Sequence, residues 1–444
     1  MEQAAQFAQV DSFPPPSPHN FNSLVSLSLT NRTNNLTHGL HRFPAKYIPQ
    51  VPRWALDAYA FTGSRVLDPF AGSGTTNVEA ASKGLDSVAL EINPLSRLII
   101  RAKTTALPVD QLSATAAAID TAWSPHKGAL ITPIEGVSNF EHWFTEPAWR
   151  ELLGLKSAIV RETHDSKELE FFLTVFSSIL RVVSNADDQS QKTYVSGTRP
   201  KSPPPVRASW ANAVQRALRG MTELNATPAP ASTVSVPDDG DALCMPLPDA
   251  SFDLAVTSPP YLDSVDYPYN LMLEHFWLAD EIGLPSRRDF NRLRQGQVGA
   301  KQPGVTGYPE RVLSDLIDLG EIPEYRRPAV QNYFAVMDRH FSEMSRVLRS
   351  GSRYVFVVGN SATRVGQLPV HKALLRLAEA HGLGLEHAFG YRLRRHYMKF
   401  PRAGRGGIIL VDWVLTLQKG LAGGRQIPDL VDAHVPIDPL AVAH

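Results

Sequence analysis

The residues with the clearest chemical potential run from Val256 to Tyr261 (VTSPPY). They follow an apolar run from Phe252 to Val256, which predicts a buried strand. The two prolines lack an N–H and fix φ near −65°, so they form a stiff knuckle at the carboxyl end of that strand. The knuckle offers the Ser258 hydroxyl, the Pro259 carbonyl and the Tyr261 ring, which suit a flat base with an exocyclic amine. The plainer alternative is a proline turn that leaves a core strand.

A second chemical stretch is DPFAGSGTT, residues 68 to 76. Asp68 is predicted at the carboxyl tip of a short strand, and Gly72 and Gly74 permit a tight turn and the close approach of a ligand. Thr75 or Thr76 is expected to cap the helix that follows. The next strand, 87 to 92, carries Glu91 one βαβ step later, where nucleotide-binding folds hold ribose hydroxyls.

Competing glycine-rich motifs do not fit this turn. A Walker loop requires Gly-Lys-Ser/Thr, which is absent, and the third glycine of the dinucleotide fingerprint is replaced by Asn77. An acid such as Asp68 would repel a pyrophosphate and attract an ammonium. S-adenosylmethionine has an ammonium, a ribose and no phosphate, so the turn favours this cofactor over a bare structural turn.

The length and composition of the chain are compatible with a large globular enzyme. The chain has 444 residues, so we expect one large domain with insertions or two domains. The apolar content of 43% and the charged content of 20% are ordinary for a globular protein. Lys plus Arg and Asp plus Glu both number 44, which argues against a protein coated in positive charge but allows a local basic groove.

The one cysteine, Cys244, rules out a disulfide within the chain and makes a cysteine-based zinc site very improbable. We expect Cys244 to be a small buried residue, no metal to be bound, and the protein to lie in a reducing cytoplasm. The N-terminal residues have neither the basic nor the apolar region of a secretory signal. No apolar run reaches about 18 residues, so no membrane span is predicted.

Two stretches are basic and free of acids. The first runs from 189 to 222 and is read as a loop; it is either a solvated linker or a phosphate contact surface. The second, 392 to 405, interleaves aromatics with cations and predicts a hairpin that grips a nucleic-acid backbone, the alternative being an exposed hairpin without a partner. The candidate DNA-contacting residues are Lys201, Arg207, Arg392, Arg394, Arg395 and Lys399.

DPFAGSGTT followed later in the chain by TSPPY resembles the motif order of the amino-group DNA methyltransferases, the S-adenosylmethionine-dependent enzymes of bacterial modification systems. HRFPAKYIP (41 to 49) is similar to the N-terminal cofactor segment of that family, and the resemblance covers most of 38 to 103 and 230 to 418. It implies an α/β fold, the Rossmann-like class I methyltransferase sheet, mostly parallel with an antiparallel last strand at 412 to 417. With the reading above, it assigns catalysis to Ser258, Pro259, Pro260 and Tyr261, and cofactor binding to Phe43, Pro44, Asp68, Phe70, Gly72, Gly74, Thr75, Glu91 and Asp241.

The resemblance also implies a domain plan. Residues 20–103 and 231–420 form the catalytic domain, which a helical insertion with a basic loop, 104–230, interrupts. Residues 280–330 form a second insertion and a candidate for target recognition. Residues 1–19 are expected to be a disordered arm, and 421–444 a C-terminal tail.

Within this family, members with Ser-Pro-Pro-Tyr mostly methylate cytosine N4, and members with Asp-Pro-Pro-Tyr mostly methylate adenine N6. Ser258 therefore predicts cytosine-N4 methylation of a base flipped out of double-stranded DNA. The alternatives are an adenine-N6 enzyme, an RNA or protein methyltransferase, and a catalytically dead DNA-binding relative. A cognate restriction endonuclease is a candidate partner, and the oligomeric state stays open.

Overall fold

The structure, a computed structural model, describes residues 7–16, 23–28, 33–44, 46–188, 190, 192–227, 232–262, 266–298, 307–362, 367–393 and 411–421. Within these residues one large sheet has the strand order β1-β2-β10-β11-β7-β6-β3-β4-β5. Its strands are β1 (Ala8–Val10), β2 (Ser23–Leu27), β3 (Val66–Asp68), β4 (Ser87–Ala89), β5 (Val234–Ser235), β6 (Phe252–Thr257), β7 (Leu348–Gly359), β10 (Leu383–Arg392) and β11 (Val411–Lys419).

The fold is α/β, and its sheet is mostly parallel, as expected. Neighbouring strands are parallel except β11, which is antiparallel to both β10 and β7. The prediction of a mostly parallel sheet with an antiparallel last strand is therefore confirmed. The strand predicted from Phe252 to Val256 is present as β6, which extends to Thr257 and pairs with β3 on one side and β7 on the other.

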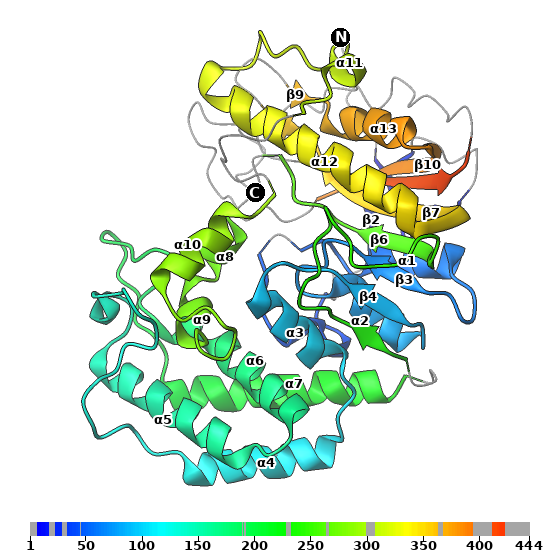
Figure 1. The fold of residues 1–444 in the computed structure, drawn as a ribbon. Coiled ribbons are helices and arrows are strands. Elements are labelled where there is room, and N and C mark those ends of the chain that lie inside the picture. The colour runs from blue at the N-terminus through cyan, green and yellow to red at the C-terminus, as the bar shows by residue number, and fades with distance from the viewer. Residues whose placement is uncertain are drawn as a thin grey trace.

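Both faces of the sheet are covered, so its central strands are apolar on both sides. On β7, Val355 and Val357 pack on the side of α1, whereas Tyr354, Phe356 and Val358 pack on the side of α12 and α13, as the alternation of side chains along a strand requires. Figure 1 shows α12 and α13 lying together over one face of the sheet. The bounds are Gln50–Tyr59 for α1, Arg327–Val347 for α12 and Val370–Ala380 for α13.

A layer of helices occupies the lower part of Figure 1 and builds a core of its own. It contains α4 to α7. Its helix α6 packs against α3 and α9, and α3 in turn contacts α2, which contacts the strands β3 and β4. The bounds are α2 (Thr75–Ser82), α3 (Pro94–Thr104), α4 (Val109–Ala122), α5 (Glu146–Glu162), α6 (Ser166–Val183), α7 (Val206–Asn225), α8 (Tyr267–Asn270), α9 (Met272–Trp277), α10 (Arg287–Gln295) and α11 (Glu310–Leu313).

Several local expectations need correction. The arm 1–19 is not wholly disordered, because β1 pairs in parallel with β2 and Phe13 is buried against Phe389 and Tyr391. The loop predicted from 189 to 222 ends earlier than expected, since α7 begins at Val206. Cys244 is exposed and not buried, because it lies in the polar turn after Asp241.

None of the helices in the described part of the chain combines the length and the apolar character that a membrane crossing needs.

Candidate active site

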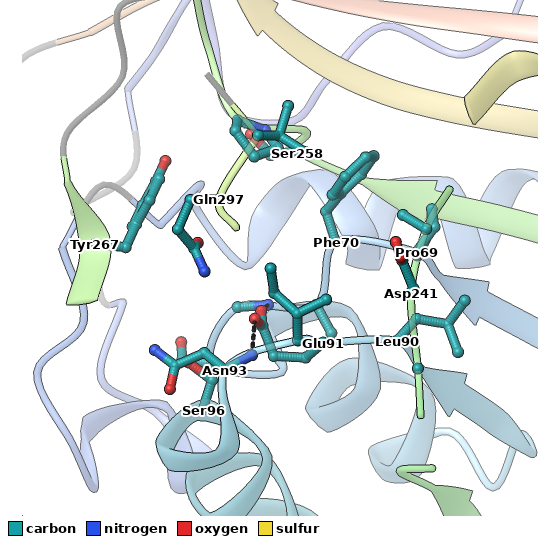
Figure 2. A pocket seen from close by; sticks show the side chains of 18 of the residues that line it. Pro69, Phe70, Leu90, Glu91, Asn93, Ser96, Asp241, Ser258, Tyr267 and Gln297 are labelled. Atoms are coloured by element: carbon teal, nitrogen blue, oxygen red, sulfur yellow. Dashed lines mark hydrogen bonds between the residues drawn. The ribbon is translucent and has the colours of Figure 1, made fainter. Parts of the chain in front are cut away.

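A cleft opens at the carboxyl ends of β3, β4 and β6. This is the edge at which open α/β sheets bind ligands. Figure 2 shows Ser258 and Glu91 on opposite sides of the cleft, with Tyr267 and Gln297 at one end and Asp241 beside Leu90 at the other. The expected site residues that line the cleft are Phe43, Phe70, Gly72, Thr75, Glu91, Asp241, Ser258 and Pro260.

Five expected residues are not among those that line the cleft. Asp68, Gly74, Pro259 and Tyr261 lie directly next to lining residues in the chain. Pro44 instead borders a small separate cavity that it shares with Arg181 and Glu274. The two sequence motifs thus meet at one cleft, while some of their members support it from behind.

The glycine turn has the backbone that its composition predicts. Gly72 and Gly74 have φ of 55° and 77°, in the left-handed region that favours glycine. A Cβ on Gly72 would lie 3.3 Å from the Phe43 ring, and one on Gly74 would lie 3.2 Å from Ile100. Gly74, and not a threonine, is the N-cap of α2, so the expected side-chain cap at Thr75 or Thr76 is absent; Thr76 Oγ1 donates to the Val256 carbonyl at 3.0 Å instead.

Asp68 joins the two motifs. Thr257 Oγ1, from the strand that leads into the knuckle, donates to Asp68 Oδ1 at 2.5 Å, and the Phe70 amide donates to the same oxygen at 3.2 Å. Asp68 Oδ2 is buried and has no hydrogen-bond partner among the described residues. Burial raises the pKa of this carboxyl to about 6. An unpaired buried carboxylate oxygen below the glycine turn fits a cationic ligand.

Glu91 shapes the floor of the cleft with both carboxylate oxygens. Oε2 accepts a hydrogen bond from the Gly72 amide, and Oε1 accepts one from the Asn93 amide, each at 2.9 Å (Figure 2). Burial raises the pKa of Glu91 to about 7. The carboxylate therefore fixes the turn and keeps lone pairs that face the cleft, which is suited to accepting bonds from a diol.

The Ser-Pro-Pro knuckle presents one hydroxyl to the cleft. Ser258 Oγ donates to the Val357 carbonyl of β7 at 3.4 Å, so its proton points towards the sheet and its lone pairs remain available as acceptors. Pro259 is buried, and Pro260 lines the cleft. The arrangement can accept hydrogen bonds from an amine but offers no strong base.

Tyr261 is held from below, away from the lining of the cleft. Its hydroxyl donates to Asp412 Oδ1, and the Tyr391 hydroxyl donates to Asp412 Oδ2, both at 3.0 Å. Burial raises the pKa of Asp412 to about 6. This clamp, which joins the knuckle to β10 and β11, was not predicted, because Asp412 and Tyr391 carry no recognisable motif. The clamp ties Tyr261 to the sheet, and the Tyr261 ring is not among the residues that line the cleft.

Sequence reasoning missed other residues that line the cleft. Lys46 is half-buried, donates to the His38 carbonyl at 3.1 Å, and has a pKa that desolvation lowers to about 8. Ser96 Oγ and Gln297 Nε2 have no hydrogen-bond partner among the described residues. Lys46 and Tyr47 lie within the FPAKY segment and could have been found there. Ser96, Gln297, Asn93 and Tyr267 also line the cleft, and no motif marks them.

Two of the expected DNA contacts are engaged within the protein. Lys201 Nζ donates to the carbonyls of Arg181 and Ala186 at 2.9 and 3.3 Å, which closes the end of α6. Arg207 donates to the Trp123 carbonyl at 3.0 Å and stacks 4.1 Å from the Trp123 ring. The Arg392 guanidinium lies 5.6 Å from the Phe7 ring, on an exposed strand end. Arg394, Arg395 and Lys399 lie outside the described residues.

Lys201→Ala is expected to lower the melting temperature without changing how DNA binding depends on salt. The lysine satisfies carbonyls at a helix end, and a hydrogen bond from a charged group contributes about 1.5–3 kcal/mol. Parallel thermal melts and DNA titrations at several salt concentrations would test this. A salt slope reduced by about one, with the melting temperature unchanged, would make Lys201 a phosphate contact after all.

The comparisons with known proteins agree with this site. Residues 15–100 match the N6/N4 methyltransferase family model, described as a DNA methylase. The chain is 25% identical over 405 residues to the type II methyltransferase M.MvaI of Kocuria varians, covering 84% of this chain and 86% of that protein. It is 22% identical over 411 residues to the type II methyltransferase M.BsoBI of Geobacillus stearothermophilus, covering 79% of each.

Among solved structures, the fold is similar to the putative DNA modification methylase TTHA0409 of Thermus thermophilus, complexed with S-adenosylmethionine. The identity is 19%, the TM-score is 0.21, and the match covers 41% of this chain and 53% of that one. The family match includes the glycine turn that forms the floor of the cleft, and the two type II relatives extend the similarity over most of the chain. Residues 15–100 thus match the N6/N4 amino-group DNA methylase family, and the chain is similar to type II methyltransferases over most of its length.

Proposed function

We propose that this protein is a site-specific DNA methyltransferase that methylates the N4 amine of a flipped cytosine. The observation that carries the proposal is the position of Ser258. Its hydroxyl lies across the cleft from Glu91, with its proton directed at Val357 and its acceptor lone pairs available. The Ser-Pro-Pro-Tyr form of the motif, which is similar to that of cytosine-N4 enzymes, supports cytosine over adenine.

The cofactor is S-adenosylmethionine, and the residues of the cleft suit it. When bound, it supplies an electrophilic methyl group on a positively charged sulfur. Glu91 would accept bonds from the ribose hydroxyls, and Asp241 would accept from the adenine amine. Asp68, with its unpaired oxygen, would attract the positive charge of the methionine end. Phe43, whose ring packs against the glycine turn, would form the apolar wall on that side.

The protein's contribution to the chemistry is orientation and hydrogen bonding. Cytosine N4 is a poor nucleophile, because its lone pair is delocalised into the ring. Ser258 Oγ and the Pro259 carbonyl would accept its two N–H bonds and favour a tetrahedral nitrogen with a localised lone pair. Holding that nitrogen in line with the methyl group converts a bimolecular step into an oriented one, which is the main source of rate at such a site. Tyr261, clamped by Asp412, would keep the knuckle in place.

The substrate is DNA, with phosphate contacts proposed for the basic segment 392 to 405, which includes Arg392, Arg394, Arg395 and Lys399. Similarity to type II methyltransferases supports a role in a restriction-modification system, with a cognate restriction endonuclease as a separate partner. A cytoplasmic location is proposed for the same reason.

The affinity for S-adenosylmethionine is expected to rise with pH between 5 and 7. The pKa of Asp68 is raised to about 6 and that of Glu91 to about 7, so both are largely protonated at pH 5. The carboxylate forms bind a cation and a diol better, so each ionisation strengthens binding. A site that requires one ionised carboxylate loses about tenfold in affinity per pH unit below its pKa. Calorimetric titrations from pH 5 to 8 measure this, and Glu91→Gln should remove the part of the dependence centred near 7. An affinity that does not change over this range would contradict the assignment.

The function is tested by incubating the protein with tritiated S-adenosylmethionine and DNA, RNA or protein, and by mass spectrometry of nucleosides from the labelled DNA. The expected product is N4-methylcytosine. N6-methyladenine would overturn the base assignment and keep the family. Label in RNA or protein alone would overturn DNA as the substrate.

A further inference from the structure

Helix α10, Arg287–Gln295, lies at the mouth of the cleft. The three residues that follow it, Gly296 to Val298, line the cleft, and Figure 2 shows the Gln297 side chain beside Tyr267. A DNA segment bound along α10 would therefore lie next to the cleft that a flipped base would enter. None of the motifs in the chain includes this helix.

One face of α10 is entirely exposed and consists of side chains that can hydrogen-bond to bases. The exposed positions follow one another at helical spacing, so they share a face. The opposite side carries Phe290, which is 2% exposed, and the half-buried Leu293 and Arg294. The exposed residues of the helix are Arg287, Arg288, Asn291, Arg292 and Gln295.

The helix is firmly attached to the wall of the cleft. Phe290 packs against the rings of His275 and Phe276, with centroids 5.3 Å away in each case. His275 Nε2 is in turn 2.9 Å from Oδ1 of the lining residue Asn93. Arg294 donates to Asp266 Oδ2 at 2.9 and 2.6 Å, immediately before the lining residue Tyr267. A ligand on the exposed face would therefore be held in a fixed position relative to the cleft.

The charge of the helix points to a polyanion. The sequence RRDFNRLRQ contains four arginines and one acid, in a chain whose net charge is zero. Arg294 is used by Asp266, and Arg292 lies 3.3 Å from Asp289 on an exposed surface, where such a pair contributes little. Arg288 has no ion-pair partner in the part of the chain that the structure describes. Arginine pairs with guanine, and asparagine or glutamine with adenine, in the major groove.

We propose that α10 is the helix that reads the DNA sequence next to the target base, with its exposed face in the major groove. This inference rests on the proposed function, since it requires a flipped base in the adjacent cleft. A helix rises about 1.5 Å per residue, so Arg288 to Gln295 spans about 10 Å. That length matches about three base-pair steps of 3.4 Å, which places the reading within a few base pairs of the target.

The test is the site preference of three alanine variants, at Arg288, Asn291 and Arg292. Each variant and the parent protein would methylate a library of duplexes with randomised positions around the target, read out by modification-sensitive sequencing. A variant that loses a base contact should methylate sites mismatched at one position about tenfold to a hundredfold better, relative to the cognate site, than the parent does. Arg161→Ala, an exposed arginine on α5, is the matched control and should keep the parental preference.

The outcomes are distinguishable. Relaxation at one position near the target supports the inference. A uniform loss across all sequences, with a salt slope reduced by about one, would make α10 a phosphate contact and overturn its assignment as the reading helix. Parental preference in all three variants would also overturn it. A parent protein that does not methylate DNA would refute the proposed function itself. The three side chains are exposed, so their replacement by alanine should not disturb folding. Unchanged S-adenosylmethionine binding would verify that each variant is folded.

Discussion

Glu91→Ala is expected to weaken S-adenosylmethionine binding by about a hundredfold or more. The carboxylate accepts the amides of Gly72 and Asn93, so its loss leaves two donors unpaired at the floor of the cleft, one of them in the glycine turn. Hydrogen bonds to a charged group contribute about 1.5–3 kcal/mol, and about 2.7 kcal/mol corresponds to a hundredfold change. Isothermal titration with S-adenosylmethionine and with its demethylated product would measure the loss.

Glu168→Ala is the control for this substitution. Glu168 is also a buried carboxylate, but it lies in α6, accepts from Thr115 and does not line the cleft. At a temperature at which the variant remains fully folded, it should show lower stability but little change in cofactor affinity. If Glu91→Ala fails to fold, Glu91→Gln keeps the side-chain volume and tests the charge. A folded Glu91 variant that binds within twofold of the parent would refute the role.

Ser258→Ala is expected to lower the rate of methyl transfer by about a hundredfold and to leave cofactor affinity unchanged. The hydroxyl contributes one acceptor that matters most as the amine becomes tetrahedral, and removing one such transition-state hydrogen bond costs about 10²–10³ in rate at other enzymes. The cofactor side of the cleft is built from β3 and β4, so it keeps its geometry. Single-turnover kinetics with cognate DNA separate this step from product release.

The chain provides a close control in Ser352→Ala. Ser352 Oγ, on β7, donates to the Phe252 carbonyl at 3.2 Å, whereas Ser258 Oγ, just after the end of β6, donates to the Val357 carbonyl. The two serines thus make the same kind of bond at opposite ends of the β6–β7 pair, and only Ser258 lines the cleft. Equal rates in the two variants would show that Ser258 acts through strand pairing alone.

The sequence predicted the parts of the fold in which local pattern and tertiary environment agree. The run from Phe252 to Val256 is apolar apart from Asp253 because its strand is central and covered on both faces, so the strand was predicted to within one residue. The pairing of β1 with β2 could not be foreseen, because the intervening chain is rich in proline and the strand is only Ala8–Val10. β1 forms a regular strand because its backbone pairs with β2.

The site was predictable to the extent that backbone requirements left a trace in the residue types. Gly72 and Gly74 are needed for positive φ, and the prolines after Ser258 are needed for a rigid tip, so both motifs are visible in the sequence. Charge gave a poorer guide. Lys201 lies in an acid-free stretch, yet its ammonium binds two carbonyls at the end of α6. Sequence states the charge of a side chain but not the direction in which it points.

Phe43 belongs to two structures at once. Its ring forms part of the wall of the cleft and also packs into the core of the helical layer, together with residues from α4 to α7. Ligand occupancy and the integrity of that layer are therefore thermodynamically linked, since anything that binds the folded cleft also stabilises the layer. A temperature-sensitive variant in a distant helix would then present as a loss of cofactor binding. Its defect would be overcome by a higher ligand concentration, although the altered residue never approaches the ligand.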